Sequence, residues 1–195
     1  MFSFVKAAGL GVVAALSIVA TAPASSAAVL YATSVDSITP GTGVVPPRDV
    51  AANALGAPDG KFLSLGIGGS AVFSFGRNFQ APGSMIEVTW GNRSRYIETA
   101  DVFGLAAGGV RTLLGQLINT TNGGVIALNF AGVFDQLEVV DTSTDPMDPR
   151  EARARDGWDI DSISVTPAPI PLPAGGVLLL SALGGVALLR RRKAA

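Results

Sequence analysis

Carboxylates are the side chains that could do chemistry in this chain of 195 residues, because the sequence contains neither cysteine nor histidine. These two absences exclude thiol nucleophiles, Ser–His–Asp triads, histidine-ligated zinc and histidine-ligated haem. Two kinds of chemistry remain. Paired carboxylates could cleave a glycosidic bond, or oxygen ligands could hold a hard cation such as calcium.

The closing segment GWDIDSISV, residues 157–165, carries two carboxylates at a spacing of two. On a β-strand, Asp159 and Asp161 would share a face with Ile163 and Val165, and carboxylates on an apolar face are costly unless they are compensated. A calcium ion would compensate them. The alternative is that both aspartates reach water beyond the sheet, or that a bulge switches the faces.

A pair of catalytic acids is not evident elsewhere in the sequence. Glu87 and Glu138 are predicted to point outward from strands, and no two acids are marked as a facing pair. We therefore predict that the chain is not an enzyme, with a small glycan hydrolase as an unfavoured alternative. The candidate acids are Glu87, Glu98, Asp101, Asp135, Glu138 and Asp141.

Three aromatic residues could stack on sugar rings. Trp90 would share a strand face with Ile86 and Val88, which favours a place in the core, so Tyr96 and Trp158 are the better candidates for glycan contact. The charged segment 142–157 is either a solvated surface loop or the rim of a binding site.

The glycine-rich segment 53–75 is predicted to form turns. Pro58-Asp59-Gly60 has the composition of a turn, in which glycine supplies the positive φ and Asp59 caps the turn with its own side chain. Gly66, Gly68 and Gly69 come directly before an expected strand. Phosphate-binding glycine clusters follow a strand and open a helix, so nucleotide binding is excluded.

The elements that must position these residues are predicted to be short strands separated by Gly, Pro, Asn and Asp. No window shows a helical apolar stripe, and segments such as LEVVD alternate with a period of two. The pattern predicts an all-β, jelly-roll-like β-sandwich of about eight strands. The expected strands are 29–33, 70–75, 85–90, 99–103, 112–118, 125–130, 134–141 and 158–165.

The N-terminal segment, residues 1–28, is predicted to be a signal peptide. It has one positive charge at Lys6, then an apolar run, then the small residues Ser26-Ala27-Ala28 before Val29. A retained membrane anchor is the alternative. The remaining domain, residues 29–166, has fifteen acidic and nine basic residues, a net charge near −6 that makes nucleic acid an unsuitable partner.

The C-terminal segment, residues 167–195, has a proline motif, an apolar stretch long enough for a transmembrane helix, and a basic end. The motif is Ile170, then Pro171, Leu172, Pro173, Ala174 and Gly175, and the basic membrane stop is Arg190, Arg191, Arg192 and Lys193. This order resembles the sorting signals of the PEP-CTERM class, in the VPLPA-CTERM variant with Ile in place of Val. The resemblance implies that an exosortase-type protease processes a precursor held transiently in the inner membrane, and that the product is displayed on the cell surface or secreted.

The domain also resembles galactose-binding-like (discoidin-type) β-sandwiches. The resemblance lies in ALGAPDGKFLSLGIGGSAVFSF at one end and GWDIDSI at the other. In related sandwiches a structural calcium joins the early loop to the last strand. That implies Asn53 and Asp59 as calcium ligands together with Asp159 and Asp161.

The function that we predict from the sequence is a non-enzymatic, structural or adhesive protein of the cell surface or extracellular matrix. The alternative is a carbohydrate-binding module that recognises an exopolysaccharide. This alternative requires an aromatic platform or a polar cleft at one end of the sandwich.

Overall fold

The computed structural model describes residues 28–88, 97–119, 124–144, 156–170, 180–184 and 190. Residues 1–27 of the predicted signal peptide lie outside this part, as do the sorting motif from Pro171 to Gly175 and the stop residues 191–193. Leu180–Gly184 and Arg190 are helical. Within the described ranges, no helix is both long and apolar enough to cross a membrane.

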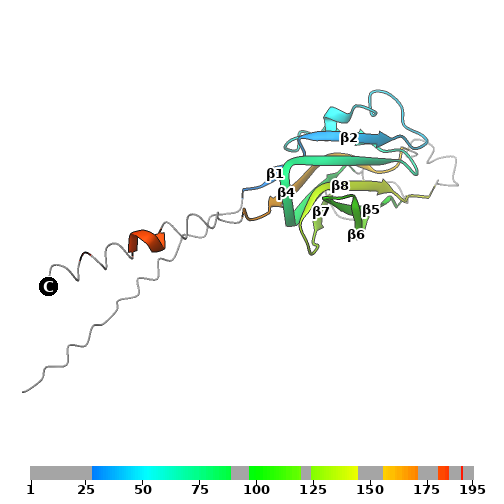
Figure 1. Cartoon of the computed structure of the whole chain (residues 1–195). Coiled ribbons are helices and arrows are strands. Elements are labelled where there is room, and N and C mark those ends of the chain that lie inside the picture. The colour runs from blue at the N-terminus through cyan, green and yellow to red at the C-terminus, as the bar shows by residue number, and fades with distance from the viewer. Residues whose placement is uncertain are drawn as a thin grey trace, which may run out of the picture.

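The described residues form nine antiparallel β-strands in one hydrogen-bonded network, which the long strand β4 folds into two layers (Figure 1). The first half of β4 pairs with β2 and β8, and β5 and β6 continue that layer. The second half pairs with β7 and β9, and β9 also pairs with β1 and β3. The elements are β1 (Leu30–Tyr31), β2 (Ser34–Thr39), η1 (Ala51–Ala54), β3 (Leu63–Ser64), β4 (Ser70–Glu87), β5 (Thr99–Ala106), β6 (Val110–Ile118), β7 (Val125–Leu128), β8 (Phe134–Asp141) and β9 (Asp159–Pro167).

Strand β4 differs from the prediction, because the expected strand at 70–75 and the beginning of the expected strand at 85–90 belong to one element of 18 residues. The register against β9 shifts between Gln80 and Gly83, so Ala81 and Pro82 have no partner there. A proline can sit in a strand at such a position, because its missing N–H is not needed for the ladder. The segment that we expected to break the strand is therefore contained within it.

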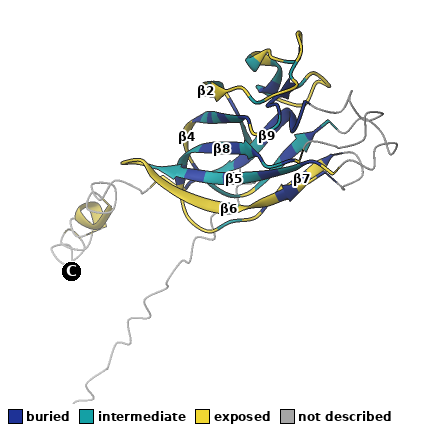
Figure 2. Ribbon diagram, turned by 90° about the vertical axis from the view of Figure 1, so that its right-hand side faces the viewer, coloured by how far each residue is buried: buried dark blue, intermediate teal, exposed yellow. Residues whose placement is uncertain are grey.

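The core lies between the two layers and follows the period-two pattern (Figure 2). Leu137 and Val139 of β8 are fully buried and alternate with the half-buried Glu138, as predicted. Phe79 packs at the bend of β4 with its ring 4.7 Å from Phe75 and 6.4 Å from Phe134, measured between centroids. The all-β sandwich is thus confirmed.

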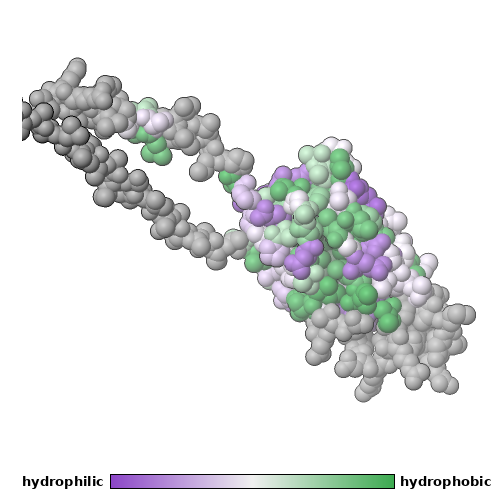
Figure 3. Space-filling model, turned by 90° about the horizontal axis from the view of Figure 1, so that it is seen from below, coloured by the Kyte–Doolittle hydropathy of each residue, from purple (hydrophilic) through white to green (hydrophobic). Residues whose placement is uncertain are grey.

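Strand β6 forms an edge of the sandwich, since it pairs with β5 alone among the described strands. Its Leu113 and Ile118, and Val125 of β7, are exposed apolar side chains. Seen from below, the surface shows such apolar groups between polar ones (Figure 3). The exposed strand edge and its apolar side chains face solvent. None of them lines the groove near η1.

The two ends of the sandwich differ in which parts of the chain they hold. Leu30 of β1 pairs with Val165 near the end of β9, so the first and last strands leave the domain side by side (Figure 1). At the opposite end, Glu87 N–H donates to Gly124 O at 2.8 Å and Asn119 N–H donates to Glu98 O at 3.1 Å. The residues that flank three connecting segments therefore meet at one end, which we call the loop end.

Candidate functional site

A groove of about 530 Å³ lies between the η1 region and the turn at Pro58–Gly60. This volume is in the range of small-ligand sites in proteins, roughly 300–1,000 Å³. Its lining combines an aromatic ring, aliphatic surface and planar or charged polar groups. The side chains that line it are Pro47, Arg48, Val50, Asn53, Lys61 and Phe62.

The turn beside the groove is fixed from below by Asp161 of β9. The backbone N–H groups of Asp59 and Gly60 donate to Asp161 Oδ1 and Oδ2, each at 3.1 Å. Gly60 has φ of 80°, and Lys61 N–H donates to Asp59 Oδ1 at 2.9 Å. The predicted turn, with its glycine and its aspartate cap, is therefore confirmed, and its join to the last strand is made by a buried carboxylate.

A β-bulge places Asp161 where it can make this contact. Ile86 of β4 pairs with Ser162, but the next residue, Glu87, pairs with Ile160, so Asp161 is the extra residue. Ile160 and Ile163 are consequently both fully buried although they are three positions apart. The expectation that Asp159 and Asp161 share a face with Ile163 is wrong, and the bulge alternative is correct.

The wall of the groove is braced by Arg48. Its Nη1 donates to Asp156 Oδ2, and its guanidinium lies 5.6 Å from the centroid of the Phe62 ring. Ser64 N–H donates to Arg48 O at 2.8 Å, and Asn53 Nδ2 donates to Phe62 O at 3.2 Å. These contacts hold the lining residues in place without a ligand, which reduces the entropy that binding would cost.

Behind this wall Asp159 is buried and accepts a hydrogen bond from Ser64 Oγ at 2.5 Å. Burial, followed by the neighbouring charge of Asp156, raises the pKa of Asp159 to about 8. Ser64 Oγ also lies 3.4 Å from Asp156 Oδ2. The carboxylates at the start of β9 therefore serve the interior of the loop end, while the groove has neutral and cationic side chains on its surface.

The four predicted calcium ligands are brought to one region of the fold, but their polar atoms have other partners. Asp59 Oδ2 is 3.1 Å from Lys61 Nζ, and Asp161 accepts two backbone N–H groups. Asn53 bonds to Phe62 O, and Asp159 bonds to Ser64. Across the described residues, no group of three or more acidic side chains is placed to hold a metal ion. Calcium at this site stays a prediction.

Glu87 and Glu98 form a second buried polar pair at the loop end. Only 1% of Glu87 and 7% of Glu98 is exposed, so the prediction that Glu87 points outward is wrong. Met85, two residues earlier, is in the core, and Glu87 follows it onto the same face of β4. Asn119 Nδ2 donates to Glu98 Oε2 at 2.9 Å, while burial and a hydrogen bond with Glu87 raise the pKa of Glu98.

Asp141 joins three segments at the loop end. Its oxygens accept N–H from Gly68 at 3.0 Å and from Trp158 at 2.8 Å, and the hydroxyl of Ser143 at 2.7 Å. A Cβ at Gly157 would lie 2.9 Å from Asp141 Oδ2 and 2.6 Å from Gly66 C, which explains why glycine is needed there. Asp141 is therefore a structural carboxylate at the C-terminal end of β8.

The prediction that Trp158 lies at the surface and contacts a glycan is wrong. Its exposed fraction is 0%, and its Nε1 lies 3.2 Å from Met85 Sδ in the core. The adjacent bulge turns the start of β9 inward, so Trp158 fills the interior. Tyr96 and Trp90 lie outside the described residues, as does 145–155 of the charged segment.

The groove residues Arg48, Lys61 and Phe62 were not predicted from the sequence. They lie outside strands, where no periodicity marks a functional side chain. The available signal was the pair Lys61-Phe62 directly after the Pro58–Gly60 turn, which sets a cation and an aromatic ring beside a rigid bend.

Comparison with known proteins supports the fold. No protein-family model and no curated protein sequence matches this chain. Among solved structures, a pectin-binding carbohydrate-binding module is similar, with 12% identity over 71% of this chain and 94% of that one and a TM-score of 0.50. The family 32 module of C. perfringens NanJ, in complex with galactose, has 13% identity, covering 71% and 98% of the two chains, and a TM-score of 0.49.

A Ruminococcus gnavus GH29 fucosidase is also similar, with 15% identity over 61% of this chain and a TM-score of 0.43, but the match spans only 22% of the fucosidase. At these identities the likeness concerns the fold. The domain has the β-sandwich architecture found in carbohydrate-binding modules.

Proposed function

We propose that the domain is a non-catalytic carbohydrate-binding module, and that the groove at Phe62 recognises an extracellular polysaccharide. The observation that carries the proposal is the pre-organised groove, in which an aromatic ring and planar polar groups are fixed by hydrogen bonds before any ligand arrives. The groove meets the requirement for a polar cleft, so it favours carbohydrate binding over a purely structural or adhesive role. The likeness to carbohydrate-binding modules supports this choice.

The lining suits a sugar because a pyranose ring has an apolar face and polar edges. The Phe62 ring and the aliphatic Pro47 and Val50 offer apolar surface, while Asn53 and Arg48 offer planar groups that bond to hydroxyls. Binding of this kind orients the sugar and needs no reacting group. Among the described residues, none of the side chains that line the groove is a carboxylate, whereas glycoside hydrolysis uses two, about 5–10 Å apart.

The proposal includes the location of the protein, which we expect to be exported. The signal peptide and the sorting motif of the sequence support export, processing by an exosortase-type protease and display at the cell surface or release. Changing both Pro171 and Pro173 to Ala should leave an unprocessed, membrane-bound precursor in cell fractionation. Normal release of that variant would contradict processing at the motif.

The binding proposal is tested with the full-length chain on an array of bacterial polysaccharides, in a detergent without a sugar headgroup. Phe62→Ala should weaken the binding that is found by about tenfold, since it removes a central aromatic contact. Val50→Trp should also weaken it, because the larger side chain fills the groove from an exposed position. Phe130→Ala, at the opposite end of the sandwich, is the matched control and should bind normally. Binding that survives both groove variants would contradict the site.

A further inference from the structure

We propose that the groove selects acidic polysaccharides and binds the carboxylate of a uronic-acid residue between Lys61 and Arg48. This inference rests on the proposed function, because it names the class of saccharide that the same groove takes. Both ionisable side chains in the lining are cationic. The surrounding domain has fifteen acidic and nine basic residues, so the two charged side chains of the lining have the sign that is in the minority in the domain.

Lys61 is the cation of the groove whose partner can be exchanged. Its side chain is 69% exposed at the rim, and its Nζ is 3.1 Å from Asp59 Oδ2, whose side chain is 51% exposed. An exposed ion pair of this kind contributes little to stability, so the carboxylate of a ligand can replace Asp59 as the partner of Lys61. The turn itself does not need that ion pair, because Asp161 holds it from below.

Arg48 supplies the fixed charge. Its ion pair with the buried Asp156 and its position over the Phe62 ring prevent the guanidinium from swinging into solvent. Guanidinium groups bind carboxylates through parallel N–H donors, and such charge-assisted hydrogen bonds are stronger than neutral ones. A cation fixed beside an aromatic ring fits a sugar that carries its carboxylate at the edge of an apolar ring face.

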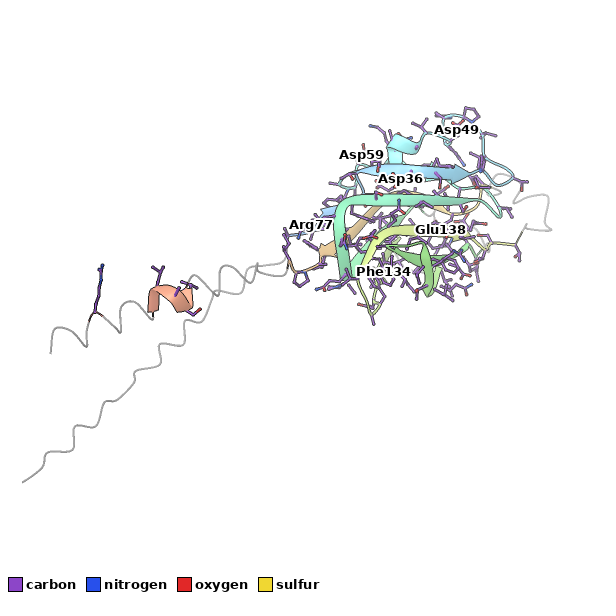
Figure 4. The ribbon with its side chains drawn as sticks, viewed as in Figure 1. Asp36, Asp49, Asp59, Arg77, Phe134 and Glu138 are labelled. Carbon is purple, nitrogen blue, oxygen red and sulfur yellow. The ribbon has the colours of Figure 1, made fainter. Side chains whose placement is uncertain are left out.

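The acidic residues near the groove do not line it. Asp156 and Asp161 are buried behind the wall, where they accept hydrogen bonds from Arg48 and from the turn. Asp49 follows Arg48 in the chain but lines a separate groove with Ile38 and Ser64. The view with side chains shows Asp49 and Asp59 at separate places on this part of the domain (Figure 4). A ligand carboxylate in the groove would therefore compete with Asp59 for Lys61 and lie beside the guanidinium of Arg48, which stays paired with Asp156.

The test compares saccharides that differ only in charge. Isothermal titration calorimetry of the full-length chain would use oligomers of galacturonic, mannuronic and glucuronic acid, each beside its carboxyl-reduced neutral form. At about 50 mM salt, at least one acidic oligomer should bind tenfold or more tightly than its neutral form. The preference should shrink at about 500 mM salt, because exposed charges are screened.

Lys61→Gln should lower the affinity for the acidic oligomer several-fold and change the affinity for the neutral form much less. Arg77→Gln is the matched control, since it removes a cation that is not in the groove lining and that donates to Ala168 O where the chain leaves the domain (Figure 4). Equal binding of the acidic and neutral forms, or an unchanged Lys61→Gln variant, would overturn this inference and leave the carbohydrate-binding proposal standing. If no saccharide binds, acidic or neutral, the proposed function fails and this inference fails with it.

Discussion

The two ends of the sandwich are stabilised by opposite chemistry. At the end where the chain enters and leaves, the core is a cluster of phenylalanine rings, which we call the phenylalanine end. At the loop end, buried carboxylates hold backbone N–H groups, hydroxyls and an arginine. The members are Phe75, Phe79, Phe130 and Phe134 at the first end and Glu87, Glu98, Asp141, Asp156, Asp159 and Asp161 at the second.

The difference shows how one small domain can be both a stable scaffold and a specific binder. Apolar packing is strong but does not direct a loop, because it has no preferred orientation for the backbone. A carboxylate that accepts two N–H groups, as Asp161 does, fixes a turn in one geometry. The groove is built beside the end that offers such directional bonds.

The largest effect should come from removing an aromatic ring at the phenylalanine end. Phe79→Ala deletes a fully buried ring that contacts three other phenylalanines, and a substitution of this kind costs about 3–5 kcal/mol. Denaturant unfolding followed by tryptophan fluorescence measures the free energy of unfolding. The control is Phe79→Leu, which keeps most of the volume and should cost about 1.5 kcal/mol or less. A loss below about 1 kcal/mol in Phe79→Ala would show that this end is not the main apolar anchor.

The sequence predicted the strands that pack against the core better than the exposed ones, for a physical reason. Strand β8 was placed at its observed bounds, because alternating Leu137 and Val139 bury one face and leave Glu138 outside. Strand β2 was missed, since four of its six residues are exposed and no apolar alternation marks it. An alternation of apolar and polar residues arises where one face of a strand is buried, so it predicts the strands that pack against the core.

The buried carboxylates of the loop end are positioned by contacts between distant segments, and a local sequence pattern does not show such contacts. Glu87 is buried and hydrogen-bonds with Glu98, which directly precedes β5, while Asn119, which directly follows β6, donates to Glu98. Asp161 is the extra residue of a bulge, and its side chain accepts a hydrogen bond from Gly60, 101 residues earlier in the chain. Such positions depend on contacts between distant segments, so the sequence could nominate Asp161 as important but not describe its partner.

The next effect in size concerns calcium, which the family resemblance predicts at the join between the early turn and β9. An ion that binds only the folded chain raises the free energy of unfolding by about 2.7 kcal/mol at a hundredfold excess over its Kd. We therefore expect a higher Tm in calcium than in a chelator. Asp59→Asn should abolish the rise, because it removes a predicted ligand whose side chain is exposed and outside the core. An unchanged Tm would show that the hydrogen bonds of Asp161 make the join without a cation.

The last prediction is a slope of stability against pH, and it should come from Glu98. Burial and the neighbouring Glu87 raise the pKa of Glu98 from 4.5 to about 10, so the folded chain keeps a proton that the unfolded chain releases above pH 4.5. The unfolded state then binds fewer protons than the folded state, and stability falls as pH rises between about 4.5 and 10. The slope is at most about 1.4 kcal/mol per pH unit for one group.

Glu98→Gln should reduce this decline between pH 5 and 9, because the amide does not titrate and its oxygen can still accept the hydrogen bond from Asn119. The raised pKa of Asp159 should account for the decline that remains below about pH 8. The control is Asp36→Asn on the outer surface. Hydrogen bonds from Ser74 and Ser34 lower the pKa of Asp36, so its contribution is lost only as the pH falls below its usual range, and the slope between pH 5 and 9 should stay. Denaturant unfolding at each pH gives both slopes. If the wild-type and Glu98→Gln slopes are equal, the buried carboxyl pair is not the source of the pH dependence. Glu98 would then ionise in the folded chain with no more loss of stability than an exposed carboxylate.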